Sequence, residues 1–86
     1  MTILVSEMHK ETLIENIDKI HTTEMGVGRI QRNLGIDDEP VSYCISKLKK
    51  EDSKVKKEGK NYYVKVDGII ITINSSSFTI ITAHKI

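Results

Sequence analysis

Hydrophobic residues near the start of the chain recur at the spacing of an α-helix. Leu13, Ile14, Ile17 and Ile20 follow one another at i, i+1, i+4 and i+7, so they share one face of a helical wheel. Ser6 precedes this run and is a residue type that caps helices by accepting a hydrogen bond from a first-turn N–H. The pattern predicts a helix over about residues 7–20.

A second helical pattern fills the stretch from His21 to Leu34. Thr22 and Thr23 are suitable caps, and Glu24 is an acid where the first turn favours one. Apolar residues recur at i, i+3 and i+7, namely Val27, Ile30 and Leu34. Gly35 is the residue type that most easily ends a helix in the left-handed conformation. We predict a helix over 23–34 whose polar face carries Arg29, Arg32 and Asn33.

The third helical pattern begins at an acidic segment and a proline. Asp37, Asp38 and Glu39 form an acidic cap before Pro40, and proline suits the first turn of a helix because its missing N–H is not needed there. Apolar residues then follow at helical spacing: Val41, Cys44, Ile45 and Leu48. This predicts a helix over about residues 39–50, with Cys44 as a small core residue.

Beyond Asp52 the pattern changes to the alternation of β-strands, with strands expected over about 54–57, 61–66, 69–74 and 78–84. The dipeptide Asp67-Gly68 is a two-residue hairpin signal that sets the register of the strands on either side. Three pairs then lie on the face that is expected to be core: Val66 with Ile69, Val64 with Ile71, and Tyr62 with Ile73.

A further turn is expected at Ser75-Ser76. It would place Phe78 opposite Ile73 and Ile80 opposite Ile71, so that Phe78 and Ile80 join the core. The second face carries a patterned set of polar side chains, Asn61, Tyr63, Lys65, Thr72 and Thr79, together with Ile70 and Ile81.

These elements predict one α+β domain over residues 1–86, in which three N-terminal helices pack on one face of a C-terminal three- or four-stranded antiparallel meander and the other face stays open. Apolar residues make up 38% of the chain, and no apolar run approaches the roughly 20 residues of a membrane span. The N-terminus lacks the features of a secretory signal, and Cys44 is the sole cysteine, so a reducing cytoplasm fits best.

Charge is unevenly distributed, although the net charge is only +1. Between Lys47 and Lys65 the chain has eight lysines against three acids. Two interpretations stay open, a solvated lysine face that protects an edge strand from pairing and a patch that binds nucleic acid.

Motifs for metals and cofactors are missing. His9, His21 and His84 show no paired ligand spacing, and Gly26-Val-Gly28 is too short for a dinucleotide loop, so no cofactor or metal is expected. Gly26-Val-Gly28 instead indicates a tight helix entrance that a backbone or a phosphate approaches closely. The remaining chemistry suits phosphate without metal, with His21 and His84 as acid or base. Cationic and aromatic partners would be Arg29, Arg32, Lys60, Lys65 and Tyr63.

Three segments carry a resemblance over nearly the whole chain: His21–Leu34, 59–66 and 71–85. They resemble a small bacterial and phage family labelled only as a domain of unknown function. More loosely, helices followed by a meander that ends in Thr-Ile-Ile-Thr-Ala-His resemble the ribonuclease toxins similar to barnase, RelE and the colicin ribonucleases. That resemblance implies RNA on the open sheet face. The sequence offers no clear carboxylate on that face as the general base of a barnase-type mechanism.

Several functions therefore compete. A metal-independent ribonuclease acting on RNA would use His21, His84, Arg29 and Tyr63 as catalytic residues. A non-catalytic module, such as a phage or mobile-element inhibitor, would bind nucleic acid or a nucleic-acid enzyme. Binding residues for either function are Thr22, Thr23, Glu24, Arg32, Asn33, Lys60, Asn61 and Lys65. The chain would be a monomer, or a homodimer formed through Ile70 and Ile81. Convergence of His21, Arg29, Tyr63 and His84 would favour catalysis, and their dispersal would favour binding.

Overall fold

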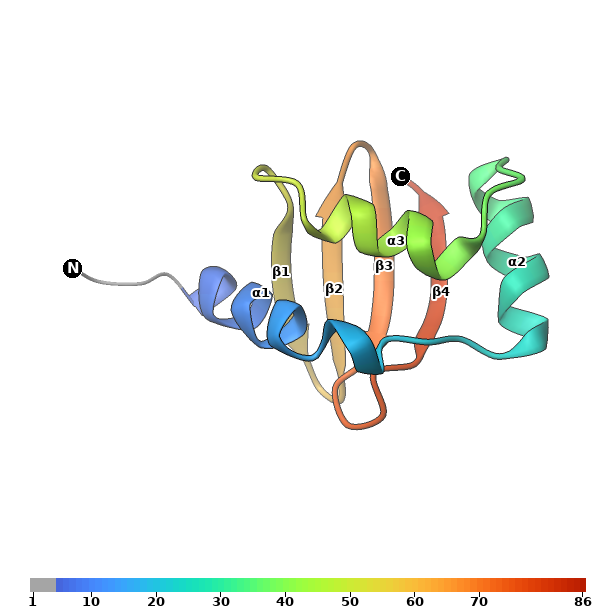
Figure 1. Ribbon diagram of the computed structural model, residues 1–86. Helices are drawn as coiled ribbons and strands as arrows, with labels where there is room; N and C mark the ends of the chain where they lie inside the picture. Colours follow the sequence, from blue (N-terminus) through green and yellow to red (C-terminus); the bar gives the residue numbers. More distant parts are fainter. Residues whose placement is uncertain (1–4) are drawn as a thin grey trace.

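The computed structural model describes residues 5–86 and has the predicted α+β architecture, with helices first and an antiparallel sheet after them (Figure 1). Within these residues the elements are α1 (Val5–Glu15), the 3-10 turn η1 (Ile17–Lys19), α2 (Glu24–Leu34), α3 (Pro40–Leu48), β1 (Lys54–Glu58), β2 (Asn61–Val66), β3 (Ile69–Asn74) and β4 (Ile80–Lys85). The four strands lie side by side in sequence order. None of the helices in this part of the chain is long and apolar enough to cross a membrane.

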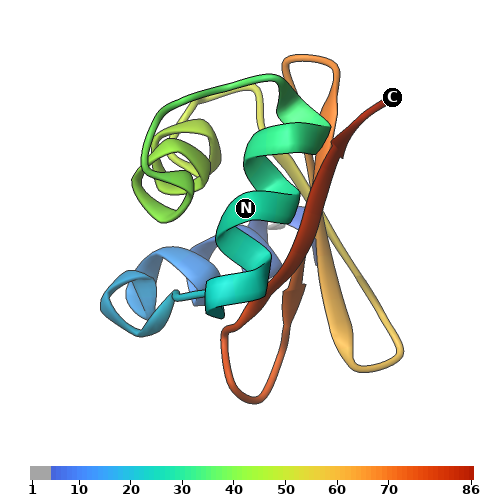
Figure 2. The same cartoon turned by 90° about the vertical axis from the view of Figure 1, so that its right-hand side faces the viewer.

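All three helices lie on one face of the sheet, and the opposite face is uncovered in the described chain (Figure 2). The core fills the layer between helices and sheet, where each element contributes its apolar face. Its buried hydrophobic residues are Leu13, Ile20, Ile30, Leu34, Cys44, Leu48, Val55, Tyr62, Val64, Val66, Ile69, Ile71, Ile73, Ile80 and Ala83.

The first helix is shorter than the sequence pattern predicts. The α-helix ends at Glu15, and a separate 3-10 turn follows at Ile17–Lys19, so the continuous helix expected over 7–20 is wrong. The Asn16 side-chain amide donates to the Thr12 carbonyl at 2.8 Å, a local bond that competes with helical backbone bonding. Ser6 lies within the helix, and its side chain is outside the described structure.

The predicted caps hold the other two helices. The Thr23 hydroxyl accepts a hydrogen bond from the Gly26 N–H, and Gly35 ends α2 with φ of 66°. Glu39 caps α3, because its carboxylate accepts the Ser42 N–H at 2.6 Å, and this bond lowers the pKa of Glu39. Helix α3 ends at Leu48, two residues before the predicted end.

The central hairpin has the predicted register. Val66 pairs with Ile69, and the ladder continues to Asn61 opposite Asn74. Asp67 and Gly68 both have positive φ, 50° and 74°, which is the geometry of a type I′ turn. Local turn chemistry thus determines which side chains of β2 and β3 face the core.

The last hairpin differs from the prediction. Ile73 pairs with Ile80 rather than with Phe78, and Ile71 pairs with Ala83, with a register shift between Thr72 and Ile73. The turn is longer than expected because the Asn74 side chain accepts the N–H groups of the two serines that follow Ser75, at 3.0 Å each. Phe78 then turns the chain with φ of 59° and packs half-buried against the core, so the strand expected at 78 begins at Ile80.

Candidate functional site

The uncovered face of the sheet carries four of the predicted site residues: Asn61, Tyr63, Lys65 and His84. Cross-strand pairing arranges this open face in rows, because directly opposed residues of antiparallel strands point to the same side. One row contains Lys54, Lys65, Ile70 and His84, the next contains Lys56, Tyr63, Thr72 and Thr82, and a third contains Glu58, Asn61 and Asn74.

A groove of about 260 Å³ runs across this open face. Its lining comes from three neighbouring strands: Lys54, Val55, Lys56, Tyr63, Lys65 and Ile70. The surface inside it is almost entirely apolar, so the lysines contribute their alkyl stems to the walls and leave their ammonium groups at the rim. The groove therefore combines an aromatic, apolar floor with a positively charged margin.

The charges around the groove are poorly neutralised. Lys54 and Lys65 are directly opposite each other, and neither makes an ion pair within residues 5–86. Lys56 lies 3.6 Å from Glu58, and both side chains are well exposed. Like charges at directly opposed positions destabilise a sheet, so this arrangement is not explained by stability.

Glu58 also corrects an expectation from the sequence. The predicted first strand ends at residue 57 and leaves the open face without a clear carboxylate, whereas β1 continues to Glu58 and pairs it with Asn61 on that face. Its nearest cation is Lys56, and Glu58 does not line the groove.

His84 lies on the open face, in the same row as Ile70 and Lys65. Its side chain is exposed near the end of β4, and it does not line the groove.

His21 lies beyond the opposite end of β4. Its backbone bonds to Phe78 and Ile80, which makes a single parallel bridge beside Thr79. Its Nδ1 is 2.8 Å from the Lys19 carbonyl oxygen, which can only accept, so Nδ1 donates. Its Nε2 is 3.1 Å from the Thr79 hydroxyl, which also bonds to Ser77 at 2.7 Å. These contacts join the α1–α2 connection to the start of β4.

The residues at the start of α2 serve the fold. Thr22 donates its hydroxyl to the Ile80 carbonyl at 2.9 Å, Thr23 caps the helix, and Glu24 is an exposed first-turn acid. The tight entrance predicted around Gly26 is real, and the protein atom that lies closest to it is the hydroxyl oxygen of Thr22, a side chain rather than a backbone.

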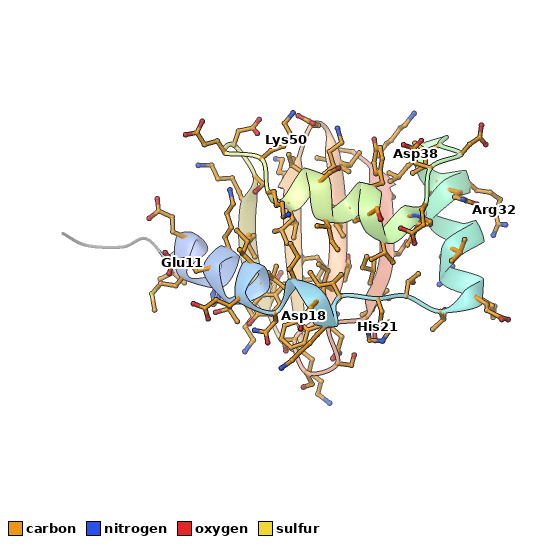
Figure 3. The ribbon with its side chains drawn as sticks, viewed as in Figure 1. Glu11, Asp18, His21, Arg32, Asp38 and Lys50 are labelled. Carbon is orange, nitrogen blue, oxygen red and sulfur yellow. The ribbon has the colours of Figure 1, made fainter. Side chains whose placement is uncertain are left out.

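The polar face of α2 is directed away from the groove. Arg29 and Arg32 are exposed, and Arg32 extends to the side of α2 that faces away from the sheet (Figure 3). Asn33 donates to the Thr82 hydroxyl at 3.3 Å and so contacts the edge of β4. Lys60 is exposed in the β1–β2 turn, and Asn61 is half-buried at the start of β2.

The four predicted catalytic residues do not form one cluster. The bridge at Thr79 and the side chain of His84 are five residues apart along the chain, about 16 Å at the usual rise of a strand. Arg29 belongs to a helix on the covered side of the sheet, whereas Tyr63 lies on the open face. Tyr63 and Lys65 alone of the predicted set line the groove.

Residues 14–84 match a family model described as a protein of unknown function, DUF3781. The chain belongs to the DUF3781 family. The match begins within α1 and ends one residue before the end of β4, so it covers α2, α3 and strands β1 to β3 in full and nearly all of β4. Neither a curated protein nor a solved structure matched the chain.

Sequence reasoning about this DUF3781 chain missed three groove residues, Lys54, Val55 and Lys56, and placed Ile70 on this face only as a dimer contact. The sequence signal that could have found them is Gly59, a residue type that favours turns. In the structure the turn consists of Gly59 and Lys60, with φ of 60° at Gly59 and with Glu58 paired to Asn61. A two-residue turn at this position pairs β1 with β2 so that alternate lysines share a face with Tyr63.

Cys44 is remote from this surface and unreactive by environment. It is 1% exposed in the core of the DUF3781 chain, and burial, followed by the charge of Glu39, raises the pKa of its thiol to about 12. The thiol therefore stays protonated at neutral pH, which leaves it without nucleophilic character. Among the described residues no three histidine, cysteine or acidic side chains are grouped to hold a metal ion.

Proposed function

We propose that the open face binds single-stranded nucleic acid, with RNA as the main ligand, and does not cleave it. The observation that carries the proposal is the groove, whose apolar walls include Tyr63 and whose rim carries the ammonium groups of Lys54, Lys56 and Lys65. A nucleotide has matching parts, a planar base with an apolar face and a phosphate with a negative charge. Sheets that bind single strands combine aromatic side chains that stack on bases with cations that contact the backbone.

In this proposal a base stacks on Tyr63, and the neighbouring phosphates lie against the lysine ammonium groups. One stacked base contributes about 1–3 kcal/mol, so a site with a single tyrosine needs the phosphate contacts as well. His84 lies beside Ile70 on the same face and extends this row at its β4 end.

Dispersal of the candidate catalytic groups favours binding over catalysis. Cleavage of RNA through its 2′-hydroxyl needs an acid and a base within hydrogen-bond reach of one phosphate. His21 is occupied in contacts with Lys19 and Thr79, and His84 lies at the other end of the strand. Cleavage of RNA by the protein is therefore the outcome that would contradict the proposed binding function.

The test measures the fluorescence anisotropy of a labelled single-stranded RNA titrated with purified protein at about 50 and 200 mM salt. We expect salt-sensitive binding that weakens at least tenfold in Lys65→Glu, and that weakens in Tyr63→Leu but persists in Tyr63→Phe. Lys57→Glu is the matched control, because Lys57 carries the same charge on β1 but pairs with Tyr62 on the opposite face.

Two results would overturn the proposal. Equal loss of binding in Lys57→Glu and Lys65→Glu would show that net charge rather than the groove is responsible. Degradation of total RNA in EDTA by the folded protein, followed on a gel, would restore the ribonuclease hypothesis.

A further inference from the structure

The two edges of the sheet differ in how far they are covered by the rest of the described chain. Along β4, the outer edge is bridged by His21 at its start and packed against α2, with Asn33 bonded to Thr82. Within the described chain β1 pairs with β2 alone, so its outer edge carries unpaired backbone groups. An open edge is a template for one more strand.

The geometry of the β1–β2 hairpin determines which backbone N–H and C=O groups of β1 point away from the sheet. The turn has two residues, Gly59 and Lys60, so the closing pair Glu58 and Asn61 exchanges both backbone hydrogen bonds. Bonding alternates along an antiparallel strand, which directs Lys56 and Lys54 inward to β2. The N–H and C=O groups of Val55 and Lys57 are therefore the free ones.

Helix α1 extends beyond this edge. It crosses β1 on the covered face and continues past the sheet, so that its N-terminal part has no strand of the described residues beneath it (Figure 1). Two apolar residues of this part stay exposed, Val5 at 66% and Met8 at 53%. Lys10 holds the helix in place by donating to the Lys50 carbonyl at 2.6 Å.

A second groove, of about 220 Å³, lies in the angle between α1 and β1. Its lining residues are Val5, His9, Val55, Lys56 and Lys57. The ring of His9 is half-buried, with its centroid 5.7 Å from that of Tyr62, so it closes the inner end against the core. The groove is thus beside the free backbone groups, where alternate side chains of an added strand would enter.

We propose that β1 accepts an extended acidic segment of a partner protein as a fifth strand beneath α1. Backbone groups of Val55 and Lys57 bond the segment, an aliphatic side chain enters the groove, and its acidic residues meet the lysines of β1. This inference does not depend on the proposed binding of nucleic acid, which uses the groove around Tyr63, although the acidic residues of the segment would meet Lys54 and Lys56, which also line that groove.

Charge selects this partner over a second copy of the chain. Strand β1 reads Lys-Val-Lys-Lys-Glu, so two copies paired through it would place lysines close to lysines. The other edge of a second copy is covered by α2 and His21. A segment in which acids alternate with aliphatic residues instead neutralises the lysines and fills the groove.

The experiment titrates ¹⁵N-labelled protein with a blocked peptide in which glutamate alternates with valine, and follows amide shifts and hydrogen exchange by NMR. We expect the amides of Val55 and Lys57 to be protected by at least about tenfold on binding, since they gain hydrogen bonds. A peptide in which lysine replaces glutamate is expected not to bind. The proposal is wrong if the glutamate peptide causes no shifts at about 1 mM, or if its shifts centre on Tyr63 and Lys65.

Two variants separate backbone pairing from charge. Lys57→Pro removes the outward N–H, which an edge strand tolerates, and is expected to abolish binding. Lys57→Ala removes the same charged side chain but keeps the N–H, so most of the affinity should remain. Equal affinity in wild type and Lys57→Pro would overturn the proposal. Retained RNA binding by Lys57→Pro shows that a loss of peptide binding is local and not a failure to fold.

Discussion

Several polar and reactive side chains of this protein have roles that their surroundings determine. His21 is held by the Lys19 carbonyl and the Thr79 hydroxyl, whereas His84, of the same chemical type, is exposed beside Ile70. Cys44 fills the core below α3. At the scale of single residues, burial and hydrogen bonding therefore separate the structural groups from those that are free to meet a ligand.

Cys44 provides a prediction at this scale. Because the pKa of its buried thiol is raised to about 12, a thiol reagent at pH 8 should modify the native protein far more slowly than the unfolded protein. Cys44→Ser should lower the free energy of unfolding by about 1–3 kcal/mol, because it buries a hydroxyl among apolar neighbours. Urea denaturation measures this loss. Rapid modification under native conditions would contradict the assignment of Cys44 to the core.

At the scale of elements, close contacts hold α2 against the sheet. The Thr22 hydroxyl donates to the Ile80 carbonyl, and a Cβ placed on Gly26 would clash with that hydroxyl. Two residues further along the helix, a Cβ on Gly28 would meet only the end of the Arg32 side chain, at 3.2 Å. The two glycines of one helix thus have different reasons to be small.

These two glycines form a matched pair of variants. Gly26→Ala should destabilise the protein by about 1–3 kcal/mol, because Thr22 must leave its bond to the β4 backbone. Gly28→Ala should be neutral or stabilise by up to about 1 kcal/mol, because alanine favours the helix and Arg32 is free to move. Thermal unfolding of the two variants tests the difference. Adding Thr22→Ala to Gly26→Ala should then cause little further loss, since the clash is removed.

The β2–β3 turn is held to α3 and to the loop that follows it by charge. Lys47 and Lys50 each lie 2.8 Å from one carboxylate oxygen of Asp67, and Lys50 is seen near this turn in Figure 3. The hydrogen bond from Lys47, and to a smaller extent the one from Lys50, lowers the pKa of Asp67. The hydrogen bond to Asp67 in turn raises the pKa of Lys47. The turn and α3 are thereby coupled through titratable groups.

The direction of this pKa shift determines a pH dependence. A carboxylate whose pKa is lower in the folded state contributes stability above its unfolded value, about 3.9, and loses it as pH falls through the folded value. Asp67→Asn keeps a residue suited to the type I′ turn but removes the charge. The wild type should therefore melt at a higher temperature than Asp67→Asn at pH 6, with the difference vanishing in acid. A difference that stays constant down to pH 2 would contradict the ion pairs.

At the scale of the whole molecule, the helices cover one face of the sheet and leave the other to lysines and Tyr63. The direct opposition of Lys54 and Lys65 lowers stability and raises the attraction of the face for anions. If this face binds anions, its like-charged lysines favour binding at the expense of stability. Removing the repulsion between them should therefore stabilise the fold and weaken the binding.

Lys65→Glu tests this trade-off. It converts the like-charged pair with Lys54 into an opposite-charged pair, which should raise the free energy of unfolding by about 0.2–1 kcal/mol. The same variant should bind RNA more weakly, as measured by anisotropy. Lys57→Glu, opposite Tyr62, has no such pair to relieve and should show neither change. Loss of both stability and binding in Lys65→Glu would argue against this trade-off.

The sequence by itself determined the features that depend on neighbouring residues. The caps at Thr23 and Glu39, the end of α2 at Gly35 and the Asp67-Gly68 turn all follow from local backbone chemistry, and the turn carries with it the register that places Tyr63 and Lys65 on one face. These features are readable because each rests on bonds within a few residues.

Only the tertiary structure decided how distant segments meet. The register of β4 depends on Phe78 in a left-handed conformation and on His21 bonding beside Thr79, a contact across 58 residues. The separation of His21 from His84, the groove between Lys54 and Ile70, and the open edge beneath α1 follow from such long-range packing. Periodicity assigns a residue to a face of its own element, but the position of that face relative to the others depends on contacts that no local pattern contains.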